Sequence, residues 1–477
     1  MDWFTDPGYW NSRWVFQHGL ALIYLVAFVA AGRQFRGLLG RDGLTPIPRF
    51  LASHSVRESP SLFHVRYSDR LFAVVAWTGA AIALAMLLGA GDRLPLTACM
   101  AVWALLWLLY LSIVNVGQIW YSFGWESLLL ETGFLAIFLG PATVEPPVLT
   151  LWLLRWVLFR VEFGAGLIKM RGDPCWRSLT CLYYHHETQP MPNPFSWYFH
   201  HLPKPLHRVE AAGNHVVQLG VPFALFLPQP VASIAAALMI LTQLWLCLSG
   251  NFAWLNWITI VLACSVIDGS WWAAVLPVEP PTMTAPTWFT VLTMLLFALV
   301  AVLSYRPVRN LISSHQAMNA SFDRLHLVNT YGAFGHVTRA RSEIVLEGTA
   351  DPHGESGWRE YEFKGKPGDP ARKPRQFAPY HLRLDWLMWF AAISSTYARG
   401  WLPTLLDRLL AGDQDTLKLL RTNPFPDDPP VWVRAVCYDY RFTTRAERRA
   451  TGDWWVRGTG FTYIGPRRRA SRVTRGG

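Results

Sequence analysis

The segment from Trp156 to Lys169 reads Trp-Val-Leu-Phe-Arg-Val-Glu-Phe-Gly-Ala-Gly-Leu-Ile-Lys, and it places Arg160, Glu162 and Lys169 inside an apolar run. In lipid, each such charge costs about 2.5–3.5 kcal/mol on insertion scales. These side chains therefore need partners within the protein. We interpret the segment as a membrane helix whose polar face points inward.

The composition of the whole chain is typical of an integral membrane protein. Of 477 residues, 52% are hydrophobic and only 16% are charged, which argues against an ordinary soluble enzyme. Many of the 25 tryptophans lie near the ends of apolar runs, where indole rings favour the lipid headgroup region. The net charge of +11 is scattered and carries no nucleic-acid motif, so we expect membrane lipids and no nucleic acid as partners.

Nine apolar runs are long enough to cross the roughly 30 Å of hydrocarbon in a bilayer. They cover residues 14–32, 71–91, 95–116, 118–140, 148–169, 211–229, 231–249, 251–267 and 287–305. The run at 251–267 is short, and a re-entrant segment is an alternative there. We therefore predict an α-helical polytopic membrane protein with eight or nine transmembrane helices.

The chain divides into a membrane part and a polar C-terminal part. We predict a transmembrane bundle over residues 1–305, with polar loops at 33–70 and 170–210, and a soluble α+β domain over 306–465. The strand-like runs of this domain cover 325–337, 342–346, 358–364 and 431–442, and its helical patterns lie near 380–396 and 402–421. Residues 466–477 are rich in arginine, and we expect a disordered basic end there.

With nine membrane helices, the two polar loops and the C-terminal domain fall on one side of the membrane. These loops contain eleven lysine and arginine residues, whereas the opposite side contains Arg13 and Arg93. The positive-inside rule would place the loop side in the cytoplasm. Long domains cross a membrane largely regardless of charge, however, so this count conflicts with an exoplasmic domain without excluding one.

Helical geometry gathers part of the charge of the 148–169 run on one face. At 100° per residue, Arg155, Glu162 and Lys169 fall within about 60° of one another, whereas Arg160 points elsewhere. Such a stripe should face the bundle interior or a water-filled cavity. Two interpretations stay open: an internal ion-pair network that fixes the helices, or a cavity in which Lys169 and Glu162 are catalytic.

Other apolar runs contain candidate partners for this stripe. Glu126 and Glu131 lie in the preceding run, and Asn214 and His215 lie in a later one. Together with Arg155 and Arg160 they form a candidate intramembrane polar network. For the later helix, hydrogen bonding between helices is favoured over a catalytic role.

The loop at 170–210 concentrates polar and aromatic residues that suit a functional surface. Its candidate residues are Asp173, Cys175, Trp176, Cys181, His185, His186, Glu187 and Asn193. The spacing of Cys175 and Cys181 permits a disulfide if the loop faces an oxidising compartment. Imidazole and carboxylate groups suit metal binding or acid–base chemistry, but their spacing matches no zinc template, so we predict no metal and no cofactor.

Several long motifs resemble the lipase maturation factor family in a bacterial-type form. In the membrane part they cover residues 163–181, 186–194 and 249–257. In the C-terminal part they cover residues 329–335, 343–348, 358–364, 383–391, 423–426 and 438–442. The resemblance implies a multi-pass membrane protein that assists the folding of secreted lipases, in the endoplasmic reticulum of animals. It also implies that the loop and the C-terminal domain face the lumen, or the periplasm in the cytoplasmic membrane of a bacterium.

A more distant resemblance suggests a different chemistry. Gly166-x-x-Lys169 followed by Trp176 looks like the transmembrane core of vitamin K-dependent gamma-carboxylases. In that family the corresponding lysine acts as a base, which implies an enzyme acting on a lipid or quinone-like substrate. The chain contains no nucleophile elbow, zincin motif or phosphate-binding loop in a plausible setting, so we expect a maturation or folding factor rather than an enzyme.

Overall fold

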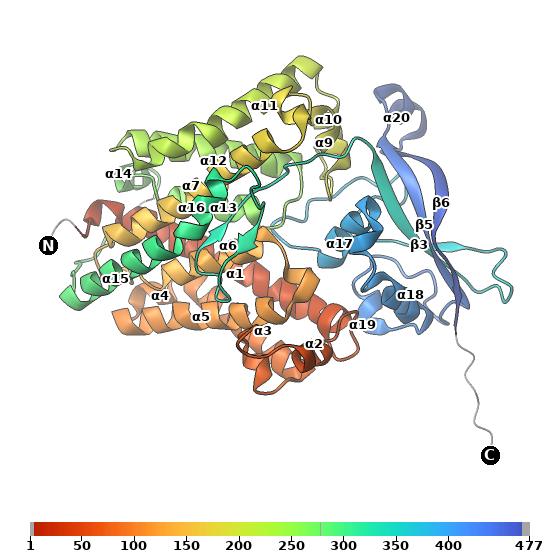
Figure 1. The fold of residues 1–477 in the computed structure, drawn as a ribbon, viewed down its shortest axis with the longest axis horizontal. Coiled ribbons are helices and arrows are strands. Elements are labelled where there is room, and N and C mark those ends of the chain that lie inside the picture. The colour runs from red at the N-terminus through yellow and green to blue at the C-terminus, as the bar shows by residue number, and fades with distance from the viewer. Residues whose placement is uncertain (1–3, 277, 470–477) are drawn as a thin grey trace.

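The computed structural model describes residues 4–276 and 278–469. A bundle of helices is followed by a C-terminal sheet with its own helices (Figure 1). Within the described residues, five helical segments are long and apolar enough to cross a membrane. Three of them are single helices: α3 (Asp69–Leu87), α5 (Leu96–Val116) and α12 (Val231–Ser249). The other two are Pro7–Leu39, formed mainly by α1 (Trp10–Leu39), and Thr287–Ile312, formed by α15 (Thr287–Leu303) and α16 (Tyr305–Ile312). The predicted class, a helical polytopic membrane protein with a C-terminal α+β domain, is confirmed.

The other predicted spans form less regular elements. The charged run forms one continuous helix, α7 (Val148–Arg171). Three runs are shorter or interrupted: 118–140 gives η3 (Gln118–Tyr121) and α6 (Gly124–Ala136), 211–229 gives the end of α11 (Lys204–Leu219) and η4 (Val221–Phe226), and 251–267 gives α13 (Leu255–Cys264). Pro222 explains the second break, because it cannot donate a backbone hydrogen bond within a continuing helix.

Two glycines of α7 allow the C-terminal part to run directly along this helix. A Cβ atom added at Gly164 would collide with the carbonyl oxygen of Tyr331, and one added at Gly172 would collide with that of Gly335. Small residues permit such close backbone approach. The segment at 331–335 therefore packs against the same helix that carries the buried charges.

The C-terminal part contains a four-stranded antiparallel sheet in the order β4-β3-β5-β6. The strands are β3 (Arg341–Thr349), β4 (Arg359–Tyr361), β5 (Trp432–Phe442) and β6 (Trp455–Arg468). In the register of the central pair, Val345 lies opposite Val436. The helices α17 (Arg383–Ile393), α18 (Leu402–Leu410) and α19 (Gln414–Leu417) lie between the sheet and the bundle (Figure 1).

Two expectations about this part were wrong. The strand expected at 325–337 is reduced to β2 (Asn329–Thr330), paired with β1 (Ala320–Ser321), because the segment inserts into the bundle. The disordered end was expected to start at residue 466, but residues 466–468 belong to β6, where Arg467 pairs with Val433. Residues 470–477 lie outside the described part of the chain.

Short helices lie within the two polar loops. They are α2 (Ile47–Ser53), η2 (Leu62–His64), α8 (Pro174–Arg177), α9 (Leu182–Thr188) and α10 (Ser196–His200). The remaining short elements are η1 (Pro7–Tyr9), α4 (Ala90–Arg93), α14 (Gly269–Ala273), η5 (Ser395–Tyr397) and α20 (Arg445–Thr451). α1 contacts α19, and α17 contacts η3, so the sheet and its helices pack onto one end of the bundle.

Candidate functional site

The four ionisable residues of the predicted apolar run in α7 are all buried, including Arg160, which was expected to point away from the other three. Arg155, Arg160, Glu162 and Lys169 expose between 1% and 6% of their surface. They do not form one stripe, however. They belong to three separate groups, each with different partners.

Lys169 begins a series of hydrogen-bonded side chains that crosses the bundle. Its Nζ donates to Asn214 Oδ1 at 2.8 Å and to Gln218 Oε1 at 2.7 Å. The amide of Gln218 in turn donates to Glu162 Oε2 at 3.2 Å. Lys169 and Glu162 are therefore connected through Gln218.

The series continues beyond Glu162 into two further helices. Gln243 of α12 donates to Glu162 Oε1 at 2.7 Å, and Asn256 of α13 donates to Gln243 Oε1 at 2.6 Å. We refer to the following residues as the Lys169 chain: Lys169, Asn214, Gln218, Glu162, Gln243 and Asn256. It ties α7, α11, α12 and α13 together through groups that would otherwise be exposed to lipid.

The contacts of Lys169 are those that a protonated amine makes. Two amide oxygens accept its protons, and its Nζ lies 4.9 Å from the centre of the Trp176 ring. His215 donates from Nε2 to the carbonyl oxygen of Trp176 at 3.0 Å, which holds this tryptophan in place. In its protonated form this amine has no lone pair with which to act as a base.

Arg155 serves the other end of α7. Its guanidinium donates to the hydroxyl of Tyr9 at 2.8 Å and to the carbonyl oxygen of Leu225 at 3.1 Å. Gln229 donates to the same Tyr9 hydroxyl at 2.8 Å. Arg155 thus joins the N-terminal segment to η4, and no hydrogen bond links it to Glu162 or Lys169.

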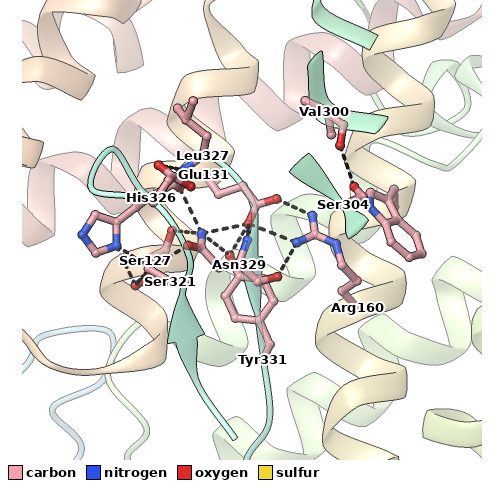
Figure 2. A network of polar contacts seen from close by, with 12 residues as sticks. Ser127, Glu131, Arg160, Val300, Ser304, Ser321, His326, Leu327, Asn329 and Tyr331 are labelled. Atoms are coloured by element: carbon pink, nitrogen blue, oxygen red, sulfur yellow. Dashed lines mark hydrogen bonds and ion pairs between the residues drawn. The ribbon is translucent and has the colours of Figure 1, made fainter. Parts of the chain in front are cut away.

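Arg160 forms a buried ion pair with Glu131 of α6, at the centre of Figure 2. Both residues are 1% exposed. The carboxylate of Glu131 also accepts the backbone N–H of Asn329 at 3.0 Å, the Asn329 side-chain amide at 2.9 Å and the Tyr331 hydroxyl at 2.5 Å. Arg160 returns a bond of 2.5 Å to the Asn329 carbonyl oxygen. We call Glu131, Arg160, Asn329 and Tyr331 the Glu131 junction.

Glu126, five residues earlier on α6, contacts the C-terminal part rather than α7. Its carboxylate accepts Arg383 at 2.7 Å and the Tyr110 hydroxyl, and it lies 3.5 Å from His381 Nδ1. Arg383 also donates to the carbonyl oxygen of Trp120 at 2.6 Å. Glu126 and Arg383 are both completely buried.

The expected pairing of the α6 glutamates was therefore partly wrong. Glu131 does contact α7, but through Arg160, the residue expected to point away from the charged face. Glu126 has no α7 partner among the described residues. The reason is the insertion of the C-terminal part, which supplies Asn329, Tyr331 and Arg383 to positions that sequence spacing within the bundle cannot reveal.

The start of the polar loop is closed by a disulfide and fastened to the C-terminal part. Cys175 and Cys181 are bonded, with their Cα atoms 4.8 Å apart, as their spacing permitted. Asp173 accepts Arg339 at 2.8 Å, and this hydrogen bond is the main reason that the pKa of Asp173 is lowered to about 2. Trp176 donates to the carbonyl oxygen of Phe334 at 2.7 Å.

The middle of the loop is held by an arginine of β3. Arg341 donates to the backbone carbonyl oxygens of Glu187 at 2.7 Å, Gln189 at 2.5 Å and Pro190 at 3.1 Å. In return, the carboxylate of Glu187 accepts the backbone N–H of Phe442 in β5 at 2.7 Å. The loop and the sheet therefore form one surface.

Two of the three remaining loop candidates, His185 and Asn193, have local packing and turn functions. The His185 ring lies 5.1 Å from the ring of Phe334 and is buried. Asn193 Oδ1 accepts the backbone N–H groups of Phe195 and Ser196, both at 3.0 Å. Its side-chain amide donates to the carbonyl oxygen of Leu248 at 2.9 Å, which attaches the loop to the end of α12.

Comparison with known proteins identifies the family. A family model described as the lipase maturation factor transmembrane domain matches residues 11–274, and one described as the lipase maturation factor C-terminal domain matches residues 327–464. This protein belongs to the lipase maturation factor family. The resemblance predicted from the sequence motifs is thus confirmed, and both the α7 region and the sheet lie within family domains.

Named relatives extend over almost the whole chain. Lipase maturation factor 1 of Homo sapiens is 42% identical, and the alignment covers 96% of this chain and 88% of that protein. Lipase maturation factor 1 of Bos taurus is 41% identical, and the alignment covers 96% of this chain and 89% of that protein. Lipase maturation factor 2 of Gallus gallus is 30% identical, and the alignment covers 94% of this chain and 80% of that protein. No solved structure shows significant similarity to the chain.

Sequence reasoning missed a buried charge cluster within the C-terminal domain of this family member. Glu343 on β3 pairs with Arg341 on the same strand and with Lys366, which follows β4, and all three are at most 2% exposed. Arg341, Ser342 and Glu343 form a polar run at the start of β3, which would ordinarily be expected to face solvent. Lys366 lies in a run rich in glycine and proline, a composition typical of turns.

A second unforeseen cluster combines two histidines and a carboxylate from separate parts of the loop and α11. His186, His207 and Glu210 can each present one atom so that all three lie within 4.8 Å of one another. Burial lowers the pKa of His186 well below its ordinary value, and the neighbouring histidines lower it further. We call these residues the histidine cluster. Among residues 4–276 and 278–469, it is the group outside the disulfide region whose ligand atoms lie close enough together to hold a metal ion.

Proposed function

We propose that this protein is a membrane-embedded maturation factor for lipases, and that its 170–210 loop and C-terminal domain contact the client enzyme. Relatives covering nearly the whole chain are named lipase maturation factors, and both family domains are present. The chain is an integral membrane protein of this family. The proposed client is a secreted, lipase-like enzyme that has not yet reached its folded state.

The structural observation that carries this proposal is the outer edge of the C-terminal sheet. β6 is 14 residues long, forms one end of the sheet, and is exposed at every residue from 458 to 462. Phe461 in this stretch is 62% exposed. An open strand edge with an exposed aromatic residue suits transient pairing with an extended, incompletely folded chain.

The loop and the C-terminal domain would then lie on the exoplasmic side of the membrane, in the endoplasmic reticulum of a eukaryote or outside the cytoplasmic membrane of a bacterium. The Cys175–Cys181 disulfide supports this orientation, because disulfides persist in oxidising compartments. The positive-inside count points the other way. Some of its loop arginines have specific partners, however: Arg36 lies 3.7 Å from Asp69, and Arg171 donates to Gln316 at 2.9 Å.

An enzyme with Lys169 as its base stays the alternative, but the geometry favours it less. To act as a base, a protonated Lys169 would first have to lose a proton, and its Nζ already donates to two amide oxygens. The Lys169 chain instead resembles a set of interhelical hydrogen bonds that fixes four helices. A functional role for Lys169 therefore requires evidence separate from stability, namely lipase maturation measured per molecule of folded Lys169→Met protein.

Gene deletion with complementation tests the proposed function. Deletion should lower the specific activity of secreted lipases without lowering the amount of lipase synthesised, and wild-type protein should restore it. Phe461→Glu should fail to restore it, since it places a charge beside the open edge. Tyr397→Glu, at another exposed aromatic of the same domain, is the matched control and should complement. Unchanged lipase activity after deletion would contradict the proposal.

The orientation has its own test by glycosylation in a eukaryotic endoplasmic reticulum. Arg449→Asn creates an Asn-Ala-Thr acceptor at an exposed position of α20. The background carries Asn319→Gln, which removes the Asn-Ala-Ser triplet already present at residues 319–321. A glycosidase-sensitive mass increase is expected for the combined variant and not for Asn319→Gln alone. Absence of this increase in a stably inserted protein would place the domain in the cytoplasm.

A further inference from the structure

His186 is a buried imidazole with unused nitrogens. The residue lies on α9, is 1% exposed, and neither of its ring nitrogens has a hydrogen-bond partner within residues 4–276 and 278–469. A neutral imidazole carries one N–H donor and one lone pair. Leaving such groups unsatisfied in a protein interior costs about 1–3 kcal/mol each, so the environment of His186 calls for a further ligand.

His207, close to His186, also has a ring nitrogen without a hydrogen-bond partner in the described chain. It is 1% exposed, and its Nε2 contacts the carbonyl oxygen of His200 at 3.4 Å. Because a carbonyl oxygen can only accept, Nε2 is the nitrogen that carries the proton in the neutral ring. Nδ1 then has only a lone pair, and it has no hydrogen-bond partner in the described chain. A backbone carbonyl that fixes the ring in this way is the usual outer contact of a metal-binding histidine.

Glu210 completes the arrangement from the next turn of α11. Its Oε1 accepts Trp245 Nε1 at 2.8 Å, which orients the carboxylate. Its Oε2 lies 4.0 Å from His207 Nδ1. The lone pairs of His207 Nδ1 and Glu210 Oε2 therefore face each other across 4.0 Å. A small cation between these two atoms would be bound by both.

We propose that His186, His207 and Glu210 bind a divalent transition-metal ion, with Zn²⁺ as the expected ion. Two imidazoles and one carboxylate are a recurrent zinc ligand set, with bonds of about 2.0–2.2 Å and one coordination position left open. Ligand atoms around such an ion are about 3–3.5 Å apart. The present spread of up to 4.8 Å would contract through small side-chain rotations.

The ion would fasten the loop between the bundle and the sheet. His186 belongs to α9, and His207 and Glu210 belong to α11, so metal binding joins these two helices. The residue after His186 is Glu187, whose carboxylate holds the backbone of β5. The Glu210 side chain is 16% exposed, which gives the ion a route from solvent. This metal site is independent of the client-binding proposal, since it would exist whether or not the client is a lipase.

The inference is tested by measuring metal binding to the full-length protein in detergent. The protein is purified without a histidine tag, and bound metal is first removed with a chelator. Wild-type protein should take up one Zn²⁺ per chain by elemental analysis. Glu210→Gln keeps an acceptor for Trp245, and it should weaken Zn²⁺ binding by at least about 100-fold, beyond the 10–100-fold typical of outer contacts. His201→Gln is the matched control, since His201 is bonded to the Trp197 carbonyl and lies outside the cluster, and it should bind as wild type does.

X-ray absorption on the metal-loaded wild type keeps the inference testable if a variant fails to fold. Two imidazole nitrogens and one carboxylate oxygen around zinc would support the site. Failure of the wild type to bind Zn²⁺, Co²⁺, Ni²⁺ or Fe²⁺ would overturn the inference. So would unchanged affinity in folded Glu210→Gln, or a ligand set containing sulfur or lacking histidine.

Discussion

The Glu131 junction and the histidine cluster are both buried groups of polar side chains, yet they differ in how completely their atoms are bonded. The carboxylate of Glu131 accepts five hydrogen bonds, two from Arg160, two from Asn329 and one from Tyr331. In the histidine cluster, by contrast, both ring nitrogens of His186 and the Nδ1 of His207 lack partners in the described chain.

This difference separates groups that hold the fold together from groups that await a ligand. A buried charge whose lone pairs are all occupied by protein donors has little capacity to bind anything else. A buried imidazole without partners is destabilising unless another molecule or ion supplies the bond. The Glu131 junction therefore belongs to the architecture that joins bundle and domain, whereas the histidine cluster can change occupancy.

The largest expected effect comes from breaking the Glu131 junction. Glu131→Ala should destabilise the protein by about 3–5 kcal/mol, because it leaves the Arg160 guanidinium buried without its counter-charge. Asn329 and Tyr331 would also lose their acceptor, so the C-terminal domain should loosen from the bundle. Thermal unfolding in detergent and limited proteolysis between residues 312 and 341 measure the two effects.

A double substitution sharpens this prediction. Glu131→Leu combined with Arg160→Met removes both charges, and it should be less destabilising than Glu131→Ala alone, because no unpaired charge remains. If the single and double variants are equally unstable, the ion pair is not what the junction contributes. In that case the contacts of Asn329 and Tyr331 would account for the loss.

A moderate effect is expected from Lys169→Met. The substitution leaves the oxygens of Asn214 and Gln218 without their donor, and the expected destabilisation is about 1–3 kcal/mol. Lipase maturation per molecule of folded protein should be retained if the Lys169 chain is structural. Complete loss of maturation at normal abundance would instead indicate chemistry at this lysine and revive the enzyme alternative.

Much of the fold was predictable because it depends on local patterns. Apolar runs of membrane-spanning length gave the long helices, and α7 was correctly placed despite its charges. Alternation of apolar residues gave β3 and β5, but it missed β6, whose glycines at 458, 460 and 465 weaken the strand signal. The break at η4 follows from Pro222, a signal that the length of the apolar run concealed.

The partners of buried charges were harder to predict because they come from distant parts of the chain. Burial of Arg160 and Glu131 followed from their position in apolar runs. Their common partner Asn329 lies 169 and 198 residues away, on a segment that local pattern assigned to a longer strand. Likewise, no spacing rule brings His186 to His207 and Glu210, because the intervening α10 and a tight turn set their distance.

The disulfide provides a smaller test on the loop between these two regions. Replacing Cys175 and Cys181 together with serine should cost about 2 kcal/mol, the chain-entropy value for closing a loop of this short length. The effect should vanish when wild-type protein is first reduced, which distinguishes loss of the bond from poor packing of serine. Equal stability of oxidised and reduced wild type would show that the bond contributes little.

The smallest expected effect comes from His186→Phe in metal-free protein, and it tests the comparison most directly. Phenylalanine retains a flat ring in the cluster and removes two nitrogens that have no partners, so stability should change by less than about 1 kcal/mol or rise slightly. Adding Zn²⁺ should raise the unfolding temperature of the wild type and leave that of the variant unchanged. A loss of several kcal/mol in the metal-free variant would mean that His186 has a structural bond like those of Glu131, and the two regions would then be alike.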